Sequence, residues 1–291
     1  MVTIALIVFC VLVFIYELSL RGAQLDAFVQ RWGAVPRVAL AALAGDPRVP
    51  RIELATLVTS QFIHAGFLHL GGNMLFLWVF GRAVEDRLGP AIYLPFYLLT
   101  GALAGLVQCL ISASETTPLI GASGAIAGVL GLYFVAYPTA WVRVLVPILF
   151  FFWAFDLPAL VVLAFWFVSQ FFNGLAAITT ATRATGDVAV WAHVAGFAIG
   201  AGANFVLPGR TSPMKASAGP SIKRADAPGP ARLVSSVADL AALLLGARLA
   251  LRFFGLLTAR SPLAFVALPI AAFVGGLVID RRRDVPEVVP A

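Results

Sequence analysis

Charged residues are scarce in this chain. Only 12% of its 291 residues are Asp, Glu, Lys or Arg, whereas 61% are apolar, and the mean hydropathy is +0.96. A soluble globular domain of this size does not need such a composition. Alternating apolar and polar segments of about 10 residues, which a closed β-barrel would show, are missing. The apolar runs instead approach the roughly 20 residues that a helix needs to cross a bilayer. The composition therefore predicts an all-α polytopic membrane protein.

Cysteine and histidine are also few, with two and three residues respectively. Cys10 and Cys109 lie in apolar runs, with no spacing that suits a disulfide framework or a metal site, so we expect them to be packing residues. His64 and His69 belong to no His-Glu-x-x-His pattern, and no carboxylate lies near them in the same apolar run. We therefore expect no metal and no other cofactor.

The basic residues lie mostly at the ends of hydrophobic runs. The net charge of +6 and the isoelectric point near 9.9 raise nucleic acid as a partner. The placement favours a membrane-orientation signal instead, and no nucleic acid. With the start of the chain in the cytoplasm, the basic residues of 208–232 and 281–283 lie on the cytoplasmic side. Five arginines between residues 21 and 51 oppose this orientation, but the reverse would translocate both C-terminal clusters.

Hydropathy predicts a core of six membrane spans within residues 1–207. The first is expected to be a retained helix and not a signal peptide, because its apolar run is long and no cleavage pattern follows it. A long connection from Arg21 to about Gln61 follows, and loops of that length are often functional. A shallow hydrophobic segment is expected to begin near Val144, ahead of the fifth span. The spans cover about 2–20, 66–82, 91–112, 123–137, 157–172 and 188–207.

The C-terminal third differs in composition from this core. Residues 208–232 are rich in Pro, Gly, Ser, Lys and Arg, which predicts a flexible basic linker. Residues 233–291 are expected to form a hydrophobic hairpin of two further spans, at about 234–257 and 262–279, with a basic tail. The predicted domains are therefore 1–207, 208–232 and 233–291.

Several polar residues of the core lie within or at the mouth of apolar spans, where a central charge costs roughly 2.5–3.5 kcal/mol. Ser123 begins the fourth span and His193 lies in the sixth. Small residues let membrane helices approach closely, and both spans carry stripes of glycine. These stripes predict that the two spans touch and bring Ser123 within hydrogen-bonding reach of His193. The glycines are Gly124, Gly128 and Gly131 in the fourth span, and Gly196 and Gly200 in the sixth.

A serine hydroxyl attacks a carbonyl only when a nearby base takes its proton, and an imidazole suits that task. Acyl transfer also needs donors for the oxyanion. His69 and Asn73 are four residues apart on one helix face, and they are candidates together with the backbone N–H of Ser123. Asp187 is expected to be a solvated loop residue, so a dyad is the simpler interpretation. Packing alone also explains glycine stripes, and a single Gly-x-Ser-Gly pattern is weak.

As a set, these residues resemble the rhomboid family of intramembrane serine proteases, over about residues 1–207. The resemblance rests on His-Ala-Gly-Phe-Leu-His at 64–69 with Gly-Asn-Met at 72–74, on Gly-Ala-Ser-Gly at 121–124, and on Ala-His-Val-Ala-Gly at 192–196. Three features depart from the family, and one of them is the C-terminal pair of expected spans, which lies outside the common six-helix core. Ala127 stands where many members carry an aromatic residue that stacks on the catalytic histidine. The usual Trp-Arg pair of the first loop has Arg51 as its nearest candidate.

The resemblance implies a serine endopeptidase that cuts a peptide bond in or near a transmembrane segment, without metal or ATP. Ser123 would be the nucleophile and His193 the general base. His69, Asn73 and Gly121 would support the oxyanion, and His64 would order the entrance to the site. The long first loop would lie partly in the outer leaflet, and the fifth span would be a lateral gate.

The implied partners are single-pass or polytopic membrane proteins within the lipid bilayer. No Ser-rich, Arg-rich presequence precedes the first span, so we expect a bacterial plasma membrane, with the active site open to the outer side. A catalytically inactive rhomboid-like protein that binds transmembrane helices is the chief alternative. A transporter or channel is another, although no internal repeat supports it.

Overall fold

The computed structural model of this protein describes residues 1–148, 151–179, 189–209 and 279–280. They belong to one compact unit, Met1–Thr211 with Gly276–Ala291. The predicted linker and C-terminal hairpin lie almost wholly outside the described residues, so these domain boundaries stay predictions.

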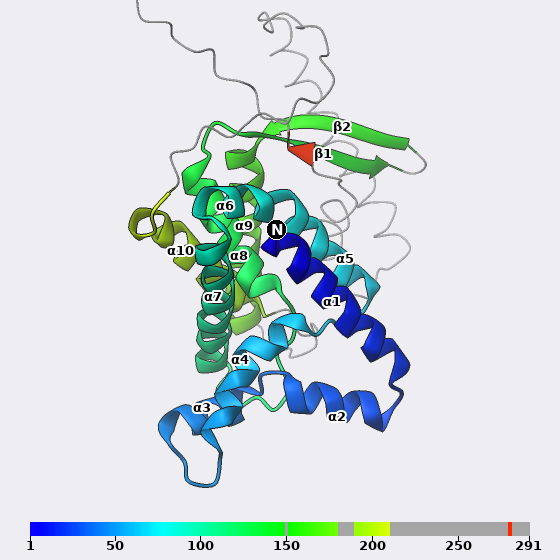
Figure 1. The fold of residues 1–291 in the computed structure, drawn as a ribbon, viewed down its shortest axis with the longest axis vertical. Coiled ribbons are helices and arrows are strands. Elements are labelled where there is room, and N and C mark those ends of the chain that lie inside the picture. The colour runs from blue at the N-terminus through cyan, green and yellow to red at the C-terminus, as the bar shows by residue number, and fades with distance from the viewer. Residues whose placement is uncertain (149–150, 180–188, 210–278, 281–291) are drawn as a thin grey trace, which may run out of the picture. The chain divides into compact units, whose positions relative to one another are not determined.

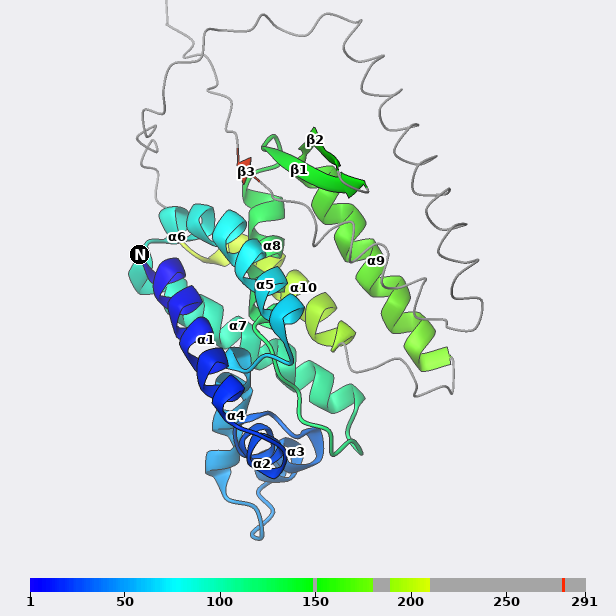
Figure 2. The same cartoon turned by 90° about the vertical axis from the view of Figure 1, so that its right-hand side faces the viewer.

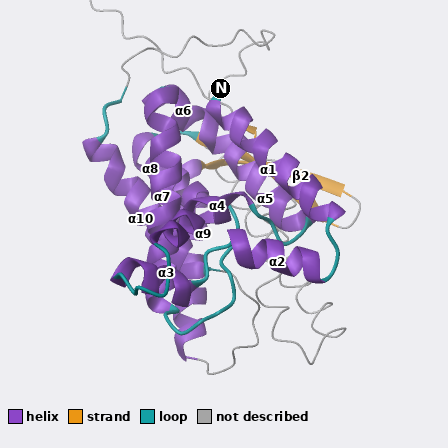
Figure 3. Ribbon diagram, turned by 60° about the horizontal axis from the view of Figure 1, so that its bottom comes forward, coloured by secondary structure: helices purple, strands orange, loops and turns teal. Residues whose placement is uncertain are grey.

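The described residues are mostly helical, as the sequence predicts (Figures 1 and 3). Each of the six predicted spans overlaps a helix or a continuous run of helices, although the second and fifth helical segments continue beyond the predicted ends, to Leu88 and Thr179. The second span consists of three pieces, α5, the π-helical turn η3 and α6. The elements are α1 (Val2–Ser19), α5 (Phe67–Phe76), η3 (Leu77–Gly81), α6 (Arg82–Leu88), α7 (Pro90–Ile111), α8 (Ser123–Ala136), α9 (Ala159–Thr179) and α10 (Val190–Val206).

Three of these segments are long and apolar enough to cross a membrane by themselves, namely Val2–Ser19, Phe67–Leu88 and Pro90–Ile111. The other predicted spans contain shorter apolar helices. Together the composition and the helices make the chain a multi-pass membrane protein.

The long connection after α1 is built from short helical pieces rather than from an irregular loop. Pro36 occupies the first turn of its helix, where a missing N–H costs nothing, and Gly45 ends that helix at a φ of 77°. Arg31 forms an ion pair of 3.1 Å with Glu53, which joins the first and third pieces. The pieces are α2 (Ala23–Trp32), α3 (Pro36–Ala44), η1 (Arg51–Ala55), α4 (Thr56–Thr59) and η2 (Ser60–Phe62).

The segment expected to be a shallow hydrophobic run is an antiparallel β-hairpin. β1 (Trp141–Ile148) pairs along its length with β2 (Phe151–Pro158), and β3 (Ile279–Asp280) pairs with the other edge of β1. Both long strands are rich in β-branched and aromatic residues, which favour extended backbone, and hydropathy alone does not separate such a strand from a helix. α9 begins at Ala159, close to the start predicted for the fifth span.

α8 is the most deeply buried helix of the described core. Its residues 125–133 are all buried, as expected of a helix that is apolar on every side. It packs against α7 and most extensively against α10, whereas α9 packs mainly on α10. Figure 2 shows α8 and α10 between α1 on one side and α9 on the other.

α8 and α10 approach so closely that their glycines leave no space for side chains. A Cβ added at Gly200 would lie only 2.7 Å from the Cα of Gly128. A Cβ at Gly131 would lie 2.9 Å from the backbone nitrogen of Ala201. The predicted contact between the fourth and sixth spans is therefore made backbone against backbone, along the glycine stripes.

Candidate active site

Ser123 and His193 lie at adjacent ends of the α8–α10 contact. Ser123 is the first residue of α8, and His193 lies in the first turn of α10. The Oγ of Ser123 is 2.7 Å from Nε2 of His193, and the imidazole is only 8% exposed. This is the hydrogen bond that a serine nucleophile needs with its base.

The other ring nitrogen of His193 contacts a residue that the sequence analysis did not single out. Nδ1 lies 2.9 Å from Oε1 of Gln170, which is on α9 and is itself buried. An amide oxygen only accepts, so Nδ1 carries the ring proton and Nε2 presents its lone pair to Ser123. The one signal in the sequence was an amide side chain within an otherwise apolar span.

An aromatic ring from α9 also lies against His193. The ring centroid of Trp166 is 5.9 Å from that of the imidazole, with 37° between the planes. Ala127, at the α8 position where the resemblance leads one to expect an aromatic residue, is fully buried and packs against Gly196. The aromatic neighbour of this histidine thus comes from α9.

Gln108 of α7 fixes the start of α10. Its Oε1 accepts hydrogen bonds from the backbone N–H groups of Trp191 and Ala192, at 3.0 and 3.2 Å. The first N–H groups of a helix have no partner within the helix, so a side chain from elsewhere stabilises that end. His193 follows directly, and its position depends on this cap.

Asn73 lies on the other side of the nucleophile, on α5. Its amide nitrogen Nδ2 is buried and has no hydrogen-bond partner among the described residues. It lies 3.8 Å from the position that a Cβ on Gly121 would occupy, two residues before Ser123. A buried donor without a partner is costly, so a site where a ligand oxygen completes the bond explains it.

His69 contacts the same glycine. Its Nδ1 accepts the backbone N–H of Ala65 at 3.3 Å, so the neutral ring carries its proton on Nε2. That Nε2 lies 2.8 Å from the Cβ position of Gly121, whose φ of 117° and lack of side chain allow the approach. The N–H of Gly121 itself donates to the carbonyl of Ser60, so Gly121 supports the site by leaving space rather than as a donor.

His64 lies one layer further from the nucleophile. Its ring is 5.2 Å from that of His69, its Nδ1 is 3.3 Å from the carbonyl of Phe62, and its backbone N–H donates to the carboxylate of Glu17. Burial, with a smaller contribution from His69, lowers the pKa of His64 to about 4. His64 is therefore neutral at physiological pH, and its ring lies beside that of His69.

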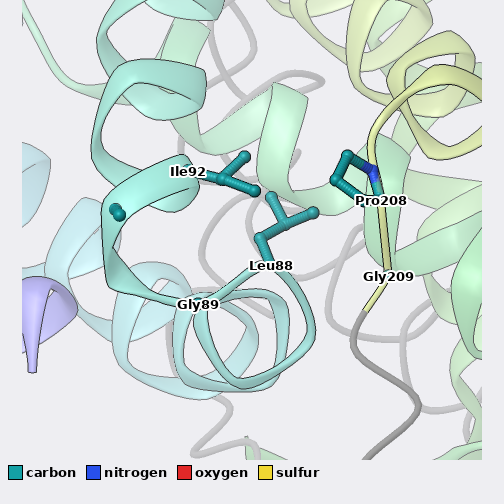
Figure 4. Close-up of a pocket in the computed structure, with 6 residues that line it drawn as sticks. Leu88, Gly89, Ile92, Pro208 and Gly209 are labelled. Carbon is teal, nitrogen blue, oxygen red and sulfur yellow. The ribbon is translucent and has the colours of Figure 1, made fainter.

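A pocket lies beside the first turn of α7 and the residues that follow α10, and Ser123 does not line it (Figure 4). Its volume is about 160 Å³, and no ionisable side chain lines it, so it offers no group for catalysis. The residues that line the pocket are Leu88, Gly89, Ala91, Ile92, Pro208 and Gly209.

Asp187, which is expected from the sequence to be a solvated loop residue, lies outside the described residues.

Comparison with known proteins identifies the family of the chain. A family model described as the Rhomboid domain matches residues 51–210, more than half of the chain. Among curated proteins, the chain is 37% identical over 89 residues to "Rhomboid protein 1, mitochondrial" of Saccharomyces cerevisiae, a match that covers 29% of this chain and 26% of that protein. It is 39% identical over 75 residues to "Rhomboid-like protein 11, chloroplastic" of Arabidopsis thaliana, covering 26% of each.

A bacterial relative is similar to the same degree. The chain is 38% identical over 81 residues to "Putative rhomboid protease YdcA" of Bacillus subtilis, which covers 26% of this chain and 38% of that protein. The chain thus matches less than two fifths of the length of each of these three relatives.

Proposed function

The chain belongs to the rhomboid family, and we propose that it is an intramembrane serine endopeptidase with Ser123 as nucleophile and His193 as general base. The observation that carries the proposal is the 2.7 Å contact between Ser123 Oγ and His193 Nε2 within an apolar helix bundle. A packing role would explain why His193 is buried. It does not explain why His193 accepts a hydrogen bond from the hydroxyl of Ser123, the first residue of a neighbouring helix.

In the first half of the reaction, Ser123 Oγ attacks the carbonyl carbon of the scissile peptide bond and its proton passes to His193 Nε2. The tetrahedral intermediate then collapses. The C–N bond breaks, and the leaving amine takes the proton from His193. The product is an ester between Ser123 and the N-terminal part of the substrate.

The oxyanion of that intermediate would be held by donors on the α5 side of the nucleophile. Asn73 supplies a buried Nδ2 that has no partner among the described residues, and His69 supplies the N–H of Nε2. The backbone N–H of Ser123 is the third donor, because the first N–H groups of a helix have no partner within it. Removal of one such donor typically costs about 10²- to 10³-fold in rate.

In the second half, water attacks the ester while His193 Nε2 takes the proton from it. The Ser123 Oγ leaves and recovers its proton from His193, which restores the dyad. Both halves use side chains of this chain and water, and neither needs a metal or ATP.

The substrates would be single-pass or polytopic membrane proteins whose peptide bond reaches Ser123 from within the bilayer. The connection after α1 would lie partly in the outer leaflet, and His64, between η2 and α5, would order the entrance to the site. The protein would be located in a bacterial plasma membrane, with its N-terminus cytoplasmic and the site open to the outer side.

The test is cleavage of a single-pass reporter helix by the purified full chain in lipid vesicles. Wild type is compared with Ser123→Ala and His193→Ala, with and without a metal chelator. We expect cleavage that both substitutions abolish and that the chelator leaves unchanged. Lack of cleavage by folded wild type across several reporters would instead favour an inactive protein that binds transmembrane helices.

A further inference from the structure

We propose that Gln170 is a positioning residue for His193, so that the catalytic group works as a Ser–His–Gln set instead of an isolated dyad. The proposal rests on the proposed protease function. Gln170 would act through the imidazole and would not touch the substrate. The argument depends on which ring nitrogen carries the proton, on burial, and on the helix that carries Gln170.

A neutral imidazole has two tautomers, and only one of them is a base toward Ser123. The proton must be on Nδ1, because Nε2 is the nitrogen that lies 2.7 Å from the serine oxygen. Gln170 Oε1 lies 2.9 Å from Nδ1 and accepts that proton. It therefore selects the productive tautomer and fixes the rotation of the ring.

Burial makes this one contact decisive. Both side chains are only 8% exposed, so water is largely excluded as an alternative acceptor for Nδ1–H. A donor left without a partner inside a protein costs about 1–3 kcal/mol, which favours the ring orientation that keeps the bond. A carboxylate would bind the same proton, but a charge within an apolar span is costly. The glutamine amide provides the acceptor without the charge.

Trp166 contributes to the same positioning. It precedes Gln170 by four residues, so both side chains project from one face of α9. Its ring lies 5.9 Å from the imidazole and 6.1 Å from Phe197 of α10. Gln170 thus binds the Nδ1 edge of His193, and Trp166 lies against the imidazole ring.

α9 supplies these contacts, whereas α8 carries only a methyl group at Ala127. The Cβ of Ala127 lies 3.2 Å from the position that a Cβ on Gly196 would occupy, and a methyl group offers the imidazole neither a hydrogen-bond acceptor nor an aromatic ring. The orientation of the base consequently depends on α9 staying packed against α10.

The experiment compares three variants of the full chain in lipid vesicles. Gln170→Leu keeps the size of the side chain but removes the acceptor, and Gln170→Glu keeps an acceptor at the same reach. Ser169→Ala is the matched control, because the hydrogen bond described for its hydroxyl goes to the carbonyl of Trp166 on its own helix. The first readout is the rate at which a fluorophosphonate labels Ser123, which needs no knowledge of the substrate. The second is the ¹⁵N NMR spectrum of labelled histidine, which reports the tautomer of His193.

We expect Gln170→Leu to slow labelling by roughly 10- to 100-fold, within the contribution of a general base, and to lower kcat on a reporter while KM changes little. The Nδ1–H signal of His193 should be lost in the same variant. Gln170→Glu and Ser169→Ala should label within about threefold of wild type. Rescue by Gln170→Glu would exclude a loss of folding as the cause.

The proposal is overturned if Gln170→Leu labels at the wild-type rate, or if His193 keeps its proton on Nδ1 without the glutamine. Equal loss of labelling in all three variants would also overturn it, because it would point to general damage to α9. Failure of the protease function looks different: wild type would then label no faster than Ser123→Ala. The tautomer of His193 would still test Gln170 in that case.

Discussion

The two sides of His193 are held in different ways. On one side, the backbones of α8 and α10 are in direct contact. If Gly200 carried a Cβ, that atom would lie only 2.7 Å from the Cα of Gly128. On the other side, α9 contacts the histidine through the side chains of Gln170 and Trp166, as far as the structure describes this helix. The first interface sets where the base lies, and the second sets how it is oriented.

The difference matters because the two interfaces respond differently to change. A contact between backbones has no rotamers to adjust, so any added atom must separate the helices. A contact through side chains can be lost and regained while the helices stay in place. One face of α9 is exposed among the described residues, at Val161, Phe165, Val168 and Phe172. We therefore expect damage to the first interface to be severe and damage to the second to be graded.

The largest effect should come from filling the backbone contact. Gly200→Leu forces α10 away from α8, separates Ser123 from His193 and should reduce labelling of Ser123 by at least about 10²-fold, since removal of a general base has that size of effect. Thermal unfolding should also shift to lower temperature. Gly202→Leu is the control, because no described residue lies within 4 Å of a Cβ added there. Equal effects of the two substitutions would contradict a special role for the α8–α10 contact.

A smaller effect is expected at the start of α10. Gln108→Leu leaves the backbone N–H of Trp191 without this acceptor, whereas that of Ala192 also donates to the carbonyl of Ala189. Stability should fall by about 1–3 kcal/mol, the cost of a buried donor without a partner. Activity should fall roughly tenfold if the shift of His193 removes about 1.4 kcal/mol of transition-state stabilisation. Thermal unfolding and reporter cleavage measure the two effects. Gln108→Glu keeps an acceptor at a helix N-terminus and should retain most of the activity; a loss as large as that of Gln108→Leu would argue against the cap.

The smallest effect should come from the aromatic contact of α9. Trp166→Leu leaves the hydrogen bonds of His193 intact and should lower kcat by a few fold, because aromatic pairs contribute about 0.5–1.5 kcal/mol beyond their buried area. Trp166→Phe should preserve most of the rate. Phe165→Leu, at a side chain that is 60% exposed, provides the control and should have no effect. If Trp166→Leu matched Gly200→Leu in severity, the two interfaces would not differ as described.

The backbone interface could be predicted from the sequence, because small residues at helical spacing both permit and mark a close approach. The glycines of α8 and α10 predicted the pairing of Ser123 with His193, and the structure places these residues 2.7 Å apart. The shared face of His69 and Asn73 was also predicted, and both contact the Gly121 region. In each case the pattern was local, within one helix or one pair of helices.

The side-chain interface could not be predicted in the same way. Gln170 is one of two amide side chains in α9, with Asn173, and its position in the sequence does not indicate that a histidine 23 residues later is its partner. The cap from Gln108 to α10 spans more than 80 residues and likewise depends on tertiary placement. The β-hairpin of β1 and β2 was missed because a continuous apolar run does not distinguish a strand from a helix.

The central claim is that Ser123, activated by His193, attacks a peptide carbonyl. The most direct measurement is the mass of the covalent adduct that the full chain forms with a fluorophosphonate, mapped to a residue and compared with reporter cleavage in the same vesicles. We predict one adduct on Ser123, loss of reporter cleavage in proportion to labelling, and almost no adduct in His193→Ala. Cleavage that persists in Ser123→Ala, or an adduct on another residue that blocks cleavage, would contradict the account.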